Sequence, residues 1–275
     1  MVQTSSISNK WEKWIVENLK NGIQPSKIVE VMLQKGCNLE ETYSTVLGCL
    51  EKRDPYHYDE PRINISGNFV KTSTDNYKIV GMFNKPLIVL VENFFSGEEC
   101  DKLIDLSGEK LKPSLIFDSS TGRPKPDPQR TSKGSGISTN EHELVTVLEK
   151  RISEFMNCPS NHGERLQVMN YKKGDEFKPH FDYLPESQIN PETGGQRIST
   201  LIVYLNDVEK GGATSFPNIN FSVAPKKGSA LYFEYCNEAG QINPLTLHCS
   251  DPVGIGEKWI AAKMMREKVI EKPIK

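Results

Sequence analysis

The first fifty-odd residues carry apolar side chains at the three- and four-residue spacing of amphipathic helices. Two consecutive groups share this spacing, Trp11, Trp14, Ile15 and Leu19, and then Ile28, Val29, Met32 and Leu33. Gly22 ends the first segment, Pro25 begins the second, and a third helix is expected over 39–50. Because three short helices bury little apolar surface, we expect residues 1–55 to be a small helical N-terminal segment that packs as an appendage or binds a partner.

The second half of the chain has the pattern of successive short strands. The strand-like segments are RLQVMNYKK, FKPHFDY, RISTLIVYLNDV, INFSVAP, GSALYFEY, PLTLHCS and KWIAAKMM. Turn signals such as GDE, EKGG and PKKG separate them, and no helical pattern lies between them. We therefore predict a mainly β fold with flanking helices, in which residues 86–275 form a jelly-roll, or double-stranded β-helix, core.

The stretch between these halves mixes loops, a strand and two helices. A linker and entry to the core is expected over 56–85, and PLIVLVENF follows as a buried strand. Ser96 begins one helix, and another runs over about 141–156. From Ser114 to Thr139 the content of Pro, Gly and charged residues favours a long loop, functional or mobile rather than structural, with a disordered insertion as the alternative.

Composition limits the classes of function. A net charge of −2 and a pI near 6.3 give no overall attraction to a polyanion, so nucleic acid is a weak candidate partner. The six cysteines form no CxxC pair and are expected to be reduced thiols. The N-terminus lacks the apolar core of a signal peptide, and Asn84, Lys85 and Pro86 interrupt the most apolar run, so we expect a cytoplasmic protein without a membrane partner.

The stretch KPHFDY places His180 and Asp182 two residues apart in an expected strand, where both side chains project to one face. His248, in the apolar segment PLTLHCS, is the natural third member of the group. Two imidazoles and one carboxylate form the facial triad that leaves three positions open on Fe(II). Taken alone, the pattern also fits a zinc site, or residues that satisfy one another in a core.

Lys258 changes the balance between these alternatives. It begins the apolar strand KWIAAKMM, where a lysine is costly unless it meets an anion. A dicarboxylate bound to the metal through a keto-acid end would offer its far carboxylate there. With this lysine, the chain resembles the 2-oxoglutarate- and Fe(II)-dependent dioxygenases, and specifically the prolyl 4-hydroxylase family.

The resemblance covers about Pro86 to Glu267 and excludes the N-terminal helices. The matching segments, in family order, are PLIVLVENFFSGEEC, QRTSKGSG, LQVMNYKKGDEFKPHFDY, QRISTLIVYLNDVEKGGATSFP, VAPKKGSALYFEY and LHCSDPVGIGEKWIAAK. It implies that His180, Asp182 and His248 bind the iron and that Lys258 pairs with the distal carboxylate of 2-oxoglutarate. With O2, 2-oxoglutarate would be converted to succinate and CO2 as the substrate is hydroxylated, and L-ascorbate is a further expected cofactor.

The resemblance also assigns residues to the pocket around the metal. Tyr171 matches a tyrosine that contacts 2-oxoglutarate, and Thr214 matches a pocket threonine. Arg197 matches an arginine near the substrate, although an ion pair at a strand start would explain it equally well. Arg130 belongs to an RTS segment that in relatives helps to form and close the substrate groove.

Two positions depart from the family pattern. Relatives commonly carry a tyrosine that reaches the substrate three residues before the first histidine ligand, where this chain has Phe177. They also tend to carry a tryptophan where this chain has Met264. Both departures leave the iron chemistry untouched and change the wall that faces the substrate.

The presence of Asp182 favours hydroxylation, because related halogenases lack this carboxylate. We favour a hydroxylase of prolyl residues in a peptide or protein over a hydroxylase of free or carrier-bound amino acids on the same scaffold. A nucleic-acid demethylase is disfavoured, because those relatives use arginines where this chain has Lys258. A non-catalytic metal-binding or interaction protein is disfavoured because every chemistry-bearing position is intact.

Overall fold

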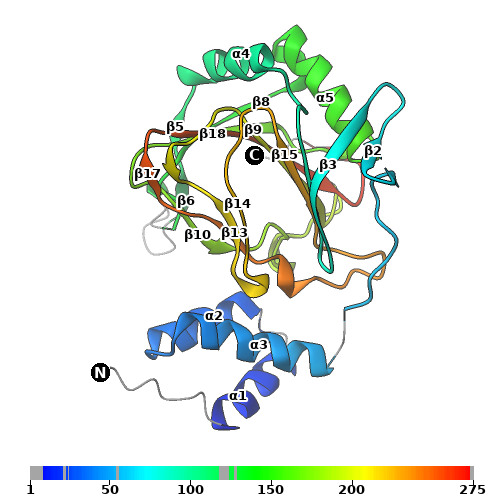
Figure 1. Ribbon diagram of the computed structural model, residues 1–275. Coiled ribbons are helices and arrows are strands. Elements are labelled where there is room, and N and C mark those ends of the chain that lie inside the picture. The colour runs from blue at the N-terminus through cyan, green and yellow to red at the C-terminus, as the bar shows by residue number, and fades with distance from the viewer. Residues whose placement is uncertain are drawn as a thin grey trace.

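The computed structural model describes residues 9–20, 23, 25–53, 56–117, 124–126 and 129–272. Figure 1 shows a β core with helices at two opposite ends. The helices are α1 (Asn9–Lys20), α2 (Pro25–Gln34) and α3 (Leu39–Arg53) at one end, and α4 (Gly97–Gly108) and α5 (Glu143–Phe155) at the other. Among the described residues, no helix has the length and apolar character needed to span a membrane.

The three predicted N-terminal helices are present, and they pack around a small core of their own. Their buried side chains are Ile15, Leu19, Ile28, Val29, Met32, Val46 and Cys49. This cluster shares no buried residue with the core of the β unit. Contacts between the two parts include those of α3 with the short 3₁₀ helix η4 (Pro217–Ile219).

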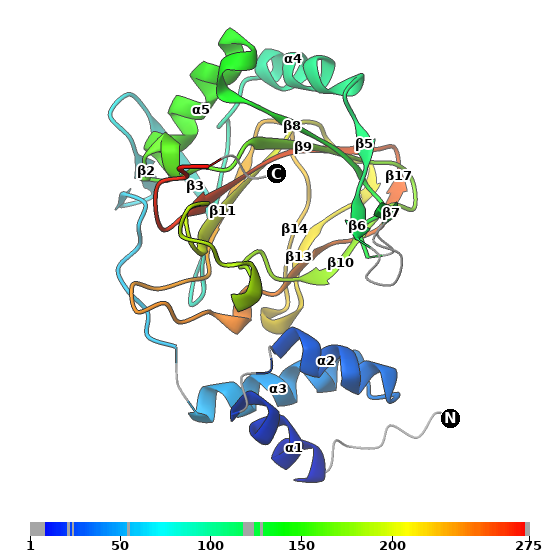
Figure 2. The same cartoon turned by 180° about the vertical axis from the view of Figure 1, so that it is seen from behind.

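The larger of two main sheets has ten antiparallel strands. In spatial order they are β1 (Ile65–Ser66), β2 (Phe69–Lys71), β3 (Asn76–Asn84), β4 (Leu87–Val91), β15 (Ala230–Glu234), β11 (Arg197–Tyr204), β18 (Lys258–Arg266), β9 (Leu166–Tyr171), β8 (Lys133–Ile137) and β5 (Lys112–Pro113). The central strands β11 and β18 are buried on both faces, because α4 and α5 cover the outer side (Figure 2). This two-sided burial explains their nearly continuous apolar sequences.

The smaller sheet faces the larger one and completes the predicted double-stranded β-helix. Its order is β10 (Phe177–His180), β16 (His248–Ser250), β13 (Thr214–Phe216) and β14 (Phe221–Val223). Two short pairs lie outside the main sheets, β12 (Lys210–Gly211) with β17 (Val253–Ile255) and β6 (Leu115–Phe117) with β7 (Pro124–Pro126). The remaining 3₁₀ helices are η1 (Thr139–Glu141), η2 (Ser160–His162), η3 (Glu186–Gln188) and η5 (Pro244–Thr246).

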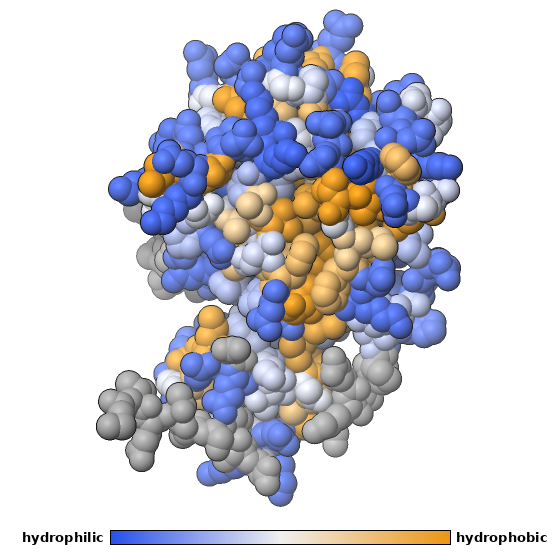
Figure 3. All heavy atoms as spheres, in the orientation of Figure 1, coloured by the Kyte–Doolittle hydropathy of each residue, from blue (hydrophilic) through white to orange (hydrophobic). Residues whose placement is uncertain are grey.

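An apolar seam joins the two sheets on the face shown in Figure 3. Between the two sheets, the rings of Phe83 of β3 and Phe221 of β14 have centroids 6.3 Å apart. Val80 and Met82, on the outward side of β3, remain 42% and 46% exposed. β3 lies in the range that the sequence pattern treated as linker, so part of that linker belongs to the large sheet.

The prediction of a single loop over Ser114–Thr139 is wrong for β8, which pairs with β9 in the large sheet. Gly134 and Gly136 make this segment look like a loop, but they serve close packing between strands. A Cβ at Gly136 would lie 3.1 Å from the side-chain nitrogen of Gln167. The predicted mobility of the loop falls partly on residues 118–123 and 127–128, which lie outside the described residues.

The six cysteines, all among the described residues, are thiols and not disulfides, as the sequence pattern led us to expect. Cys49, Cys100 and Cys236 are buried, and the other three are half-buried. Burial raises the pKa of the Cys100 thiol to about 11, so this group is a protonated packing residue near neutral pH.

Candidate metal centre and co-substrate pocket

The three predicted metal ligands lie together between the two sheets. His180 ends β10 and pairs across the small sheet with His248, which begins β16. Asp182 follows two residues later, beyond the end of β10, so the strand predicted through FKPHFDY stops earlier than expected. One possible ligand atom from each residue lies within 4.8 Å of the others, as a shared metal ion requires.

Hydrogen bonds orient both imidazoles toward the carboxylate of Asp182. The Nδ1 atom of His180 lies 2.8 Å from the carbonyl oxygen of Lys178, and that of His248 lies 3.1 Å from the carbonyl oxygen of Thr246. Because a carbonyl only accepts, each Nδ1 carries the proton and each Nε2 keeps a free lone pair. The Nε2 atoms lie 3.6 and 3.7 Å from the two oxygens of Asp182, too far for hydrogen bonds that would satisfy the group internally.

The protonation states also suit a metal. Burial, and then the neighbouring His248, lowers the pKa of His180 to about 3. Burial alone would raise the pKa of Asp182, but the two histidines, Arg197 and Thr200 outweigh it and lower the pKa. The group is therefore a carboxylate beside a neutral His180 imidazole near pH 7, which is the form that binds a metal.

Lys258 lies fully buried between the sheets, at the start of β18. Its Nζ donates to the Ser250 hydroxyl at 2.9 Å and lies 5.4 Å and 5.8 Å from the ring centroids of Tyr171 and Tyr204. Within the part of the chain that the structure describes, no carboxylate forms an ion pair with it. Burial lowers the pKa of Lys258 to about 7, so a bound anion would relieve an unfavourable site.

The other two predicted pocket residues lie beside this lysine. Tyr171 is its cross-strand partner on β9, and Thr214 is a buried residue of β13 in the small sheet. The Thr214 hydroxyl accepts a 2.8 Å hydrogen bond from the hydroxyl of Tyr204. An ammonium group and several hydroxyls thus converge from both sheets, a set that suits a carboxylate.

Arg197 makes a partly buried ion pair, as its alternative interpretation suggested. Its Nε and Nη2 donate to the two carboxylate oxygens of Glu164 at 2.6 and 2.8 Å, and its Nη1 donates to the carbonyl oxygen of Asp182 at 3.1 Å. Of the five N–H groups of an arginine, two stay available, so its contact with substrate stays a prediction.

Phe177 and Arg130 form one wall beside the triad. The Phe177 ring stacks on the His180 ring, with centroids 3.5 Å apart. The Arg130 guanidinium lies 5.1 Å from the centroid of the same Phe177 ring. Arg130 also donates to the sulfur of Met169 and to the Ser132 hydroxyl. Met264, the other departure from the family pattern, pairs with Thr200 between β18 and β11.

Sequence reasoning missed Thr200, Tyr235 and Glu164. The Thr200 hydroxyl donates to Oδ2 of Asp182 at 2.6 Å, and the Tyr235 hydroxyl lies 3.2 Å from the Thr200 oxygen. No spacing in the sequence links Thr200 and Tyr235 to Asp182, or Glu164 to Arg197, because the contacts join separate segments of the chain.

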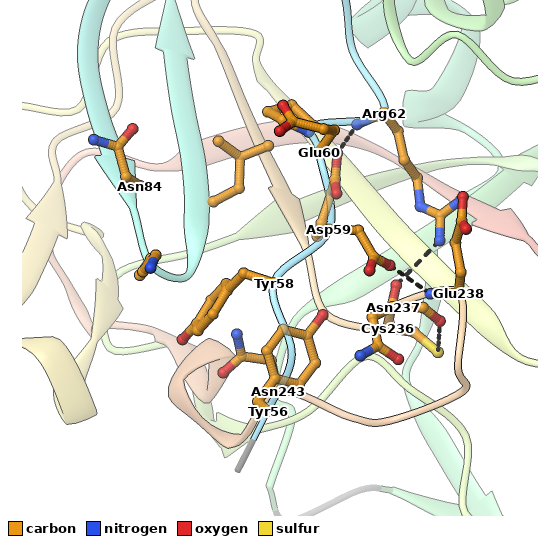
Figure 4. A pocket seen from close by; sticks show the side chains of 14 residues that line it. Tyr56, Tyr58, Asp59, Glu60, Arg62, Asn84, Cys236, Asn237, Glu238 and Asn243 are labelled. Carbon is orange, nitrogen blue, oxygen red and sulfur yellow. Dashed lines mark hydrogen bonds between the residues drawn. The ribbon is translucent and has the colours of Figure 1, made fainter.

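A second hollow of about 390 Å³ lies where the linker meets the core (Figure 4). It is lined by residues of 56–62, of the β3–β4 turn and of 234–243. Linker and core are joined there by hydrogen bonds from the Arg62 amide to Glu234 and from the Glu238 amide to Asp59, at 2.9 and 2.7 Å. None of the residues predicted for metal, co-substrate or substrate lines this hollow.

Comparison with known proteins agrees with this chemistry. The family described as "2OG-Fe(II) oxygenase superfamily" matches residues 166–266, which include the triad and Lys258. Probable prolyl 4-hydroxylase 3 of Arabidopsis thaliana is 36% identical over 66% of this chain and 69% of its own length, and prolyl 4-hydroxylase 5 of the same plant is 38% identical over 65% and 68%.

A solved structure shows the same likeness. The viral collagen prolyl hydroxylase of Paramecium Bursaria Chlorella virus-1, in complex with 2OG, matches with a TM-score of 0.53 and 30% identity, over 65% of this chain and 95% of that one. The segment that the family model matches, 166–266, lies in the β core, and the three residues of the His–Asp–His group lie close together there. The chain therefore belongs to the prolyl 4-hydroxylase family of 2-oxoglutarate- and Fe(II)-dependent oxygenases.

Proposed function

We propose that this dioxygenase hydroxylates prolyl residues in a peptide or protein. The single observation that carries its co-substrate chemistry is the buried Lys258, which has no carboxylate partner among the described residues. The same β core contains the His–Asp–His group. Support for a prolyl substrate comes from the named activities of the relatives in Arabidopsis and in the Chlorella virus.

We assign the metal to His180, Asp182 and His248, and the distal carboxylate of 2-oxoglutarate to Lys258. When bound, Fe(II) and 2-oxoglutarate supply the oxidation with O2 and release succinate and CO2. The Nδ1–H groups of both histidines donate to backbone carbonyls, which leaves each Nε2 to face the metal, and Asp182 keeps its negative charge.

The remaining pocket residues orient the co-substrate and exclude water. Tyr171 and Tyr204 enclose the lysine with aromatic faces, and the hydroxyl of Thr214 adds a polar contact from the small sheet. The Phe177 ring, with the Arg130 guanidinium beside it, covers one face of His180.

A second candidate is hydroxylation of a free or carrier-bound amino acid. It is favoured by the substrate wall, where Phe177 offers no hydroxyl and three N–H groups of Arg197 are already engaged. Fewer donors remain there for the backbone of an extended peptide than the family pattern provides.

The test incubates the pure protein with Fe(II), 2-oxoglutarate and either proline-rich peptides or free amino acids, and follows the mass gain of one oxygen atom together with succinate. His180→Ala and His248→Ala should abolish iron binding and succinate formation, and Asp182→Ala should impair both severely. Turnover of peptides supports the first candidate, and turnover of free amino acids alone supports the second. Normal turnover by either histidine variant rules out this triad.

Stimulation by L-ascorbate and a cytoplasmic location stay predictions. Omission of ascorbate from multiple-turnover assays tests the first, and cell fractionation tests the second.

A further inference from the structure

We propose that Thr200, held in turn by Tyr235, is a positioning residue that makes Asp182 offer only one carboxylate oxygen to the metal. The inference rests on the metal role proposed above for the triad, and it is independent of which substrate is hydroxylated.

Asp182 needs such support because it lies beyond the end of β10, outside the hydrogen-bond ladder that holds His180. Two residues of strand β11 hydrogen-bond to it instead. The Arg197 guanidinium donates to its backbone carbonyl at 3.1 Å, and the Thr200 hydroxyl donates to its Oδ2 at 2.6 Å. Main chain and side chain are thus both fixed from one rigid central strand.

The Asp182 carboxylate determines which group donates in the hydrogen bonds that join Asp182, Thr200 and Tyr235. A carboxylate can only accept, so the single hydroxyl proton of Thr200 is committed to Asp182. Across the 3.2 Å contact with Tyr235, the tyrosine must therefore donate to the Thr200 oxygen. Thr200 and Tyr235 are each only 1% exposed, so solvent does not compete for these hydrogen bonds.

This arrangement distinguishes the two oxygens of Asp182. Oδ2 is engaged by Thr200, while Oδ1 lies 3.6 Å from the Nε2 of His180 and has no protein donor among the described contacts. A carboxylate that chelates through both oxygens would occupy two coordination positions, whereas a facial triad leaves three positions open only if it uses one. Thr200 therefore limits how many positions the protein itself fills.

The experiment uses the full chain without metal and Co(II) as a spectroscopic probe. Binding is titrated, and the visible d–d absorption reports which ligand atoms surround the ion. Thr200→Val should weaken Co(II) binding by about 10- to 100-fold, the usual effect of losing a group that orients a ligand. It should also change the d–d spectrum, because a second carboxylate oxygen takes a position that water fills in the wild type. Thr200→Ser should retain the wild-type values, and Tyr235→Phe should shift both readouts in the direction of the valine variant by a smaller amount.

Ser107→Ala is the matched control, because it removes another buried hydroxyl, one that donates to the Leu103 carbonyl inside α4. It should leave Co(II) affinity and spectrum unchanged. Wild-type behaviour of Thr200→Val overturns the proposal, and so does an equal loss in Thr200→Ser, because packing would then matter rather than the hydroxyl. Should the valine variant not fold, Tyr235→Phe decides, and an unchanged spectrum overturns the proposal.

A separate outcome concerns the triad itself. If His180→Ala binds Co(II) as tightly as the wild type, the metal assignment fails, and this inference fails with it. If His180→Ala loses binding while Thr200→Val does not, the triad stands and only the role of Thr200 is refuted.

Discussion

A charged lysine in an apolar interior has a high free energy until an anion reaches it, and Lys258 is in this situation. Its nearest polar contact is a neutral hydroxyl, and it is enclosed by two tyrosine rings. The same group that destabilises the empty pocket therefore favours a carboxylate ligand strongly, which links the cost of burial to the choice of co-substrate.

Removal of this ammonium should weaken 2-oxoglutarate binding specifically. We expect Lys258→Ala to raise the KM for 2-oxoglutarate by roughly 10- to 100-fold, because a buried hydrogen bond to a charged group contributes about 1.5–3 kcal/mol. Iron affinity should change little. Lys258→Arg should restore binding poorly, since its planar fork is larger than an ammonium group. Steady-state titration of 2-oxoglutarate at saturating iron is the measurement, and an unchanged KM in the alanine variant refutes the assignment.

The lowered pKa of Lys258 also predicts a pH dependence of binding. With a pKa of about 7 in the free protein, the lysine loses its proton as pH rises above that value. A bound carboxylate stabilises the ammonium and raises its pKa, so binding takes up a proton in this range. The affinity for 2-oxoglutarate should fall by up to about tenfold per pH unit above pH 7 and stay nearly constant just below it.

Isothermal titration in buffers of different ionisation enthalpy measures this proton uptake directly. Lys258→Ala is the control, and its weaker binding should lose the pH dependence over the same range. A flat profile for the wild type from pH 7 to pH 8 contradicts the prediction.

The candidate metal ligands and the candidate co-substrate lysine were predictable from the sequence, whereas the residues that hydrogen-bond to them were not. His180, His248 and Lys258 are conspicuous in apolar strands because burial of such groups needs a reason. Thr200 looks like an ordinary strand residue within RISTLIVY, and its role depends on a contact with a loop that only the folded chain creates.

At the scale of elements, the hydrophobic pattern predicted strands with long apolar runs better than those with glycines or few residues. β9, β11 and β18 were predicted because burial on both faces demands a continuous apolar sequence. β13 has three residues and β8 contains two glycines, so neither carries a strand signal of its own. Both are defined by pairing with neighbours far along the chain, which local patterns do not record.

A buried ion pair joins a helix to the large sheet and should matter for stability. Glu149 of α5 and Lys263 of β18 are 1% and 2% exposed and pair with each other. Lys263→Met should lower the free energy of unfolding by about 3–5 kcal/mol, because it leaves the carboxyl group buried without a partner. The double variant Glu149→Leu/Lys263→Met should recover most of this loss.

Urea unfolding of the single and double variants measures the two free energies. Lys226→Met is the matched control, because it removes a lysine from an exposed pair with Glu92 and should change stability little. If the double variant is no more stable than Lys263→Met alone, the loss came from packing rather than from the unpaired charge.

At the scale of the whole molecule, the protein is built from two units with separate cores. The buried cluster of α1–α3 shares no residue with the cluster that fills the β-helix. The linker, in contrast, belongs to the larger unit, since 57–62 is hydrogen-bonded to the end of β15 and to the segment that follows it.

A chain shortened to begin at Tyr56 should therefore fold and bind metal. We expect its Co(II) affinity to stay within about threefold of the full chain, since a unit with its own core folds independently. Circular dichroism melts and Co(II) titration test this, and a shortened chain that does not fold contradicts the separation of the cores. If 2-oxoglutarate decay persists while peptide turnover drops, the helices contribute to substrate binding rather than to the fold.

The hydrogen bond of Lys258 to Ser250 should make the pocket select dicarboxylates by their length. Ser250 follows His248 by two residues on β16, a step of about 6.8 Å along a strand, and Lys258 reaches it from the opposite sheet. With the metal at the proposed triad, the distance from metal to ammonium is set by the strand repeat and not by an adjustable loop. A diacid that chelates at one end has to match this step, so oxaloacetate should be too short and 2-oxoadipate too long. Replacement of 2-oxoglutarate by either acid should strongly reduce uncoupled decarboxylation, and equal use of all three would show that the pocket does not select by length.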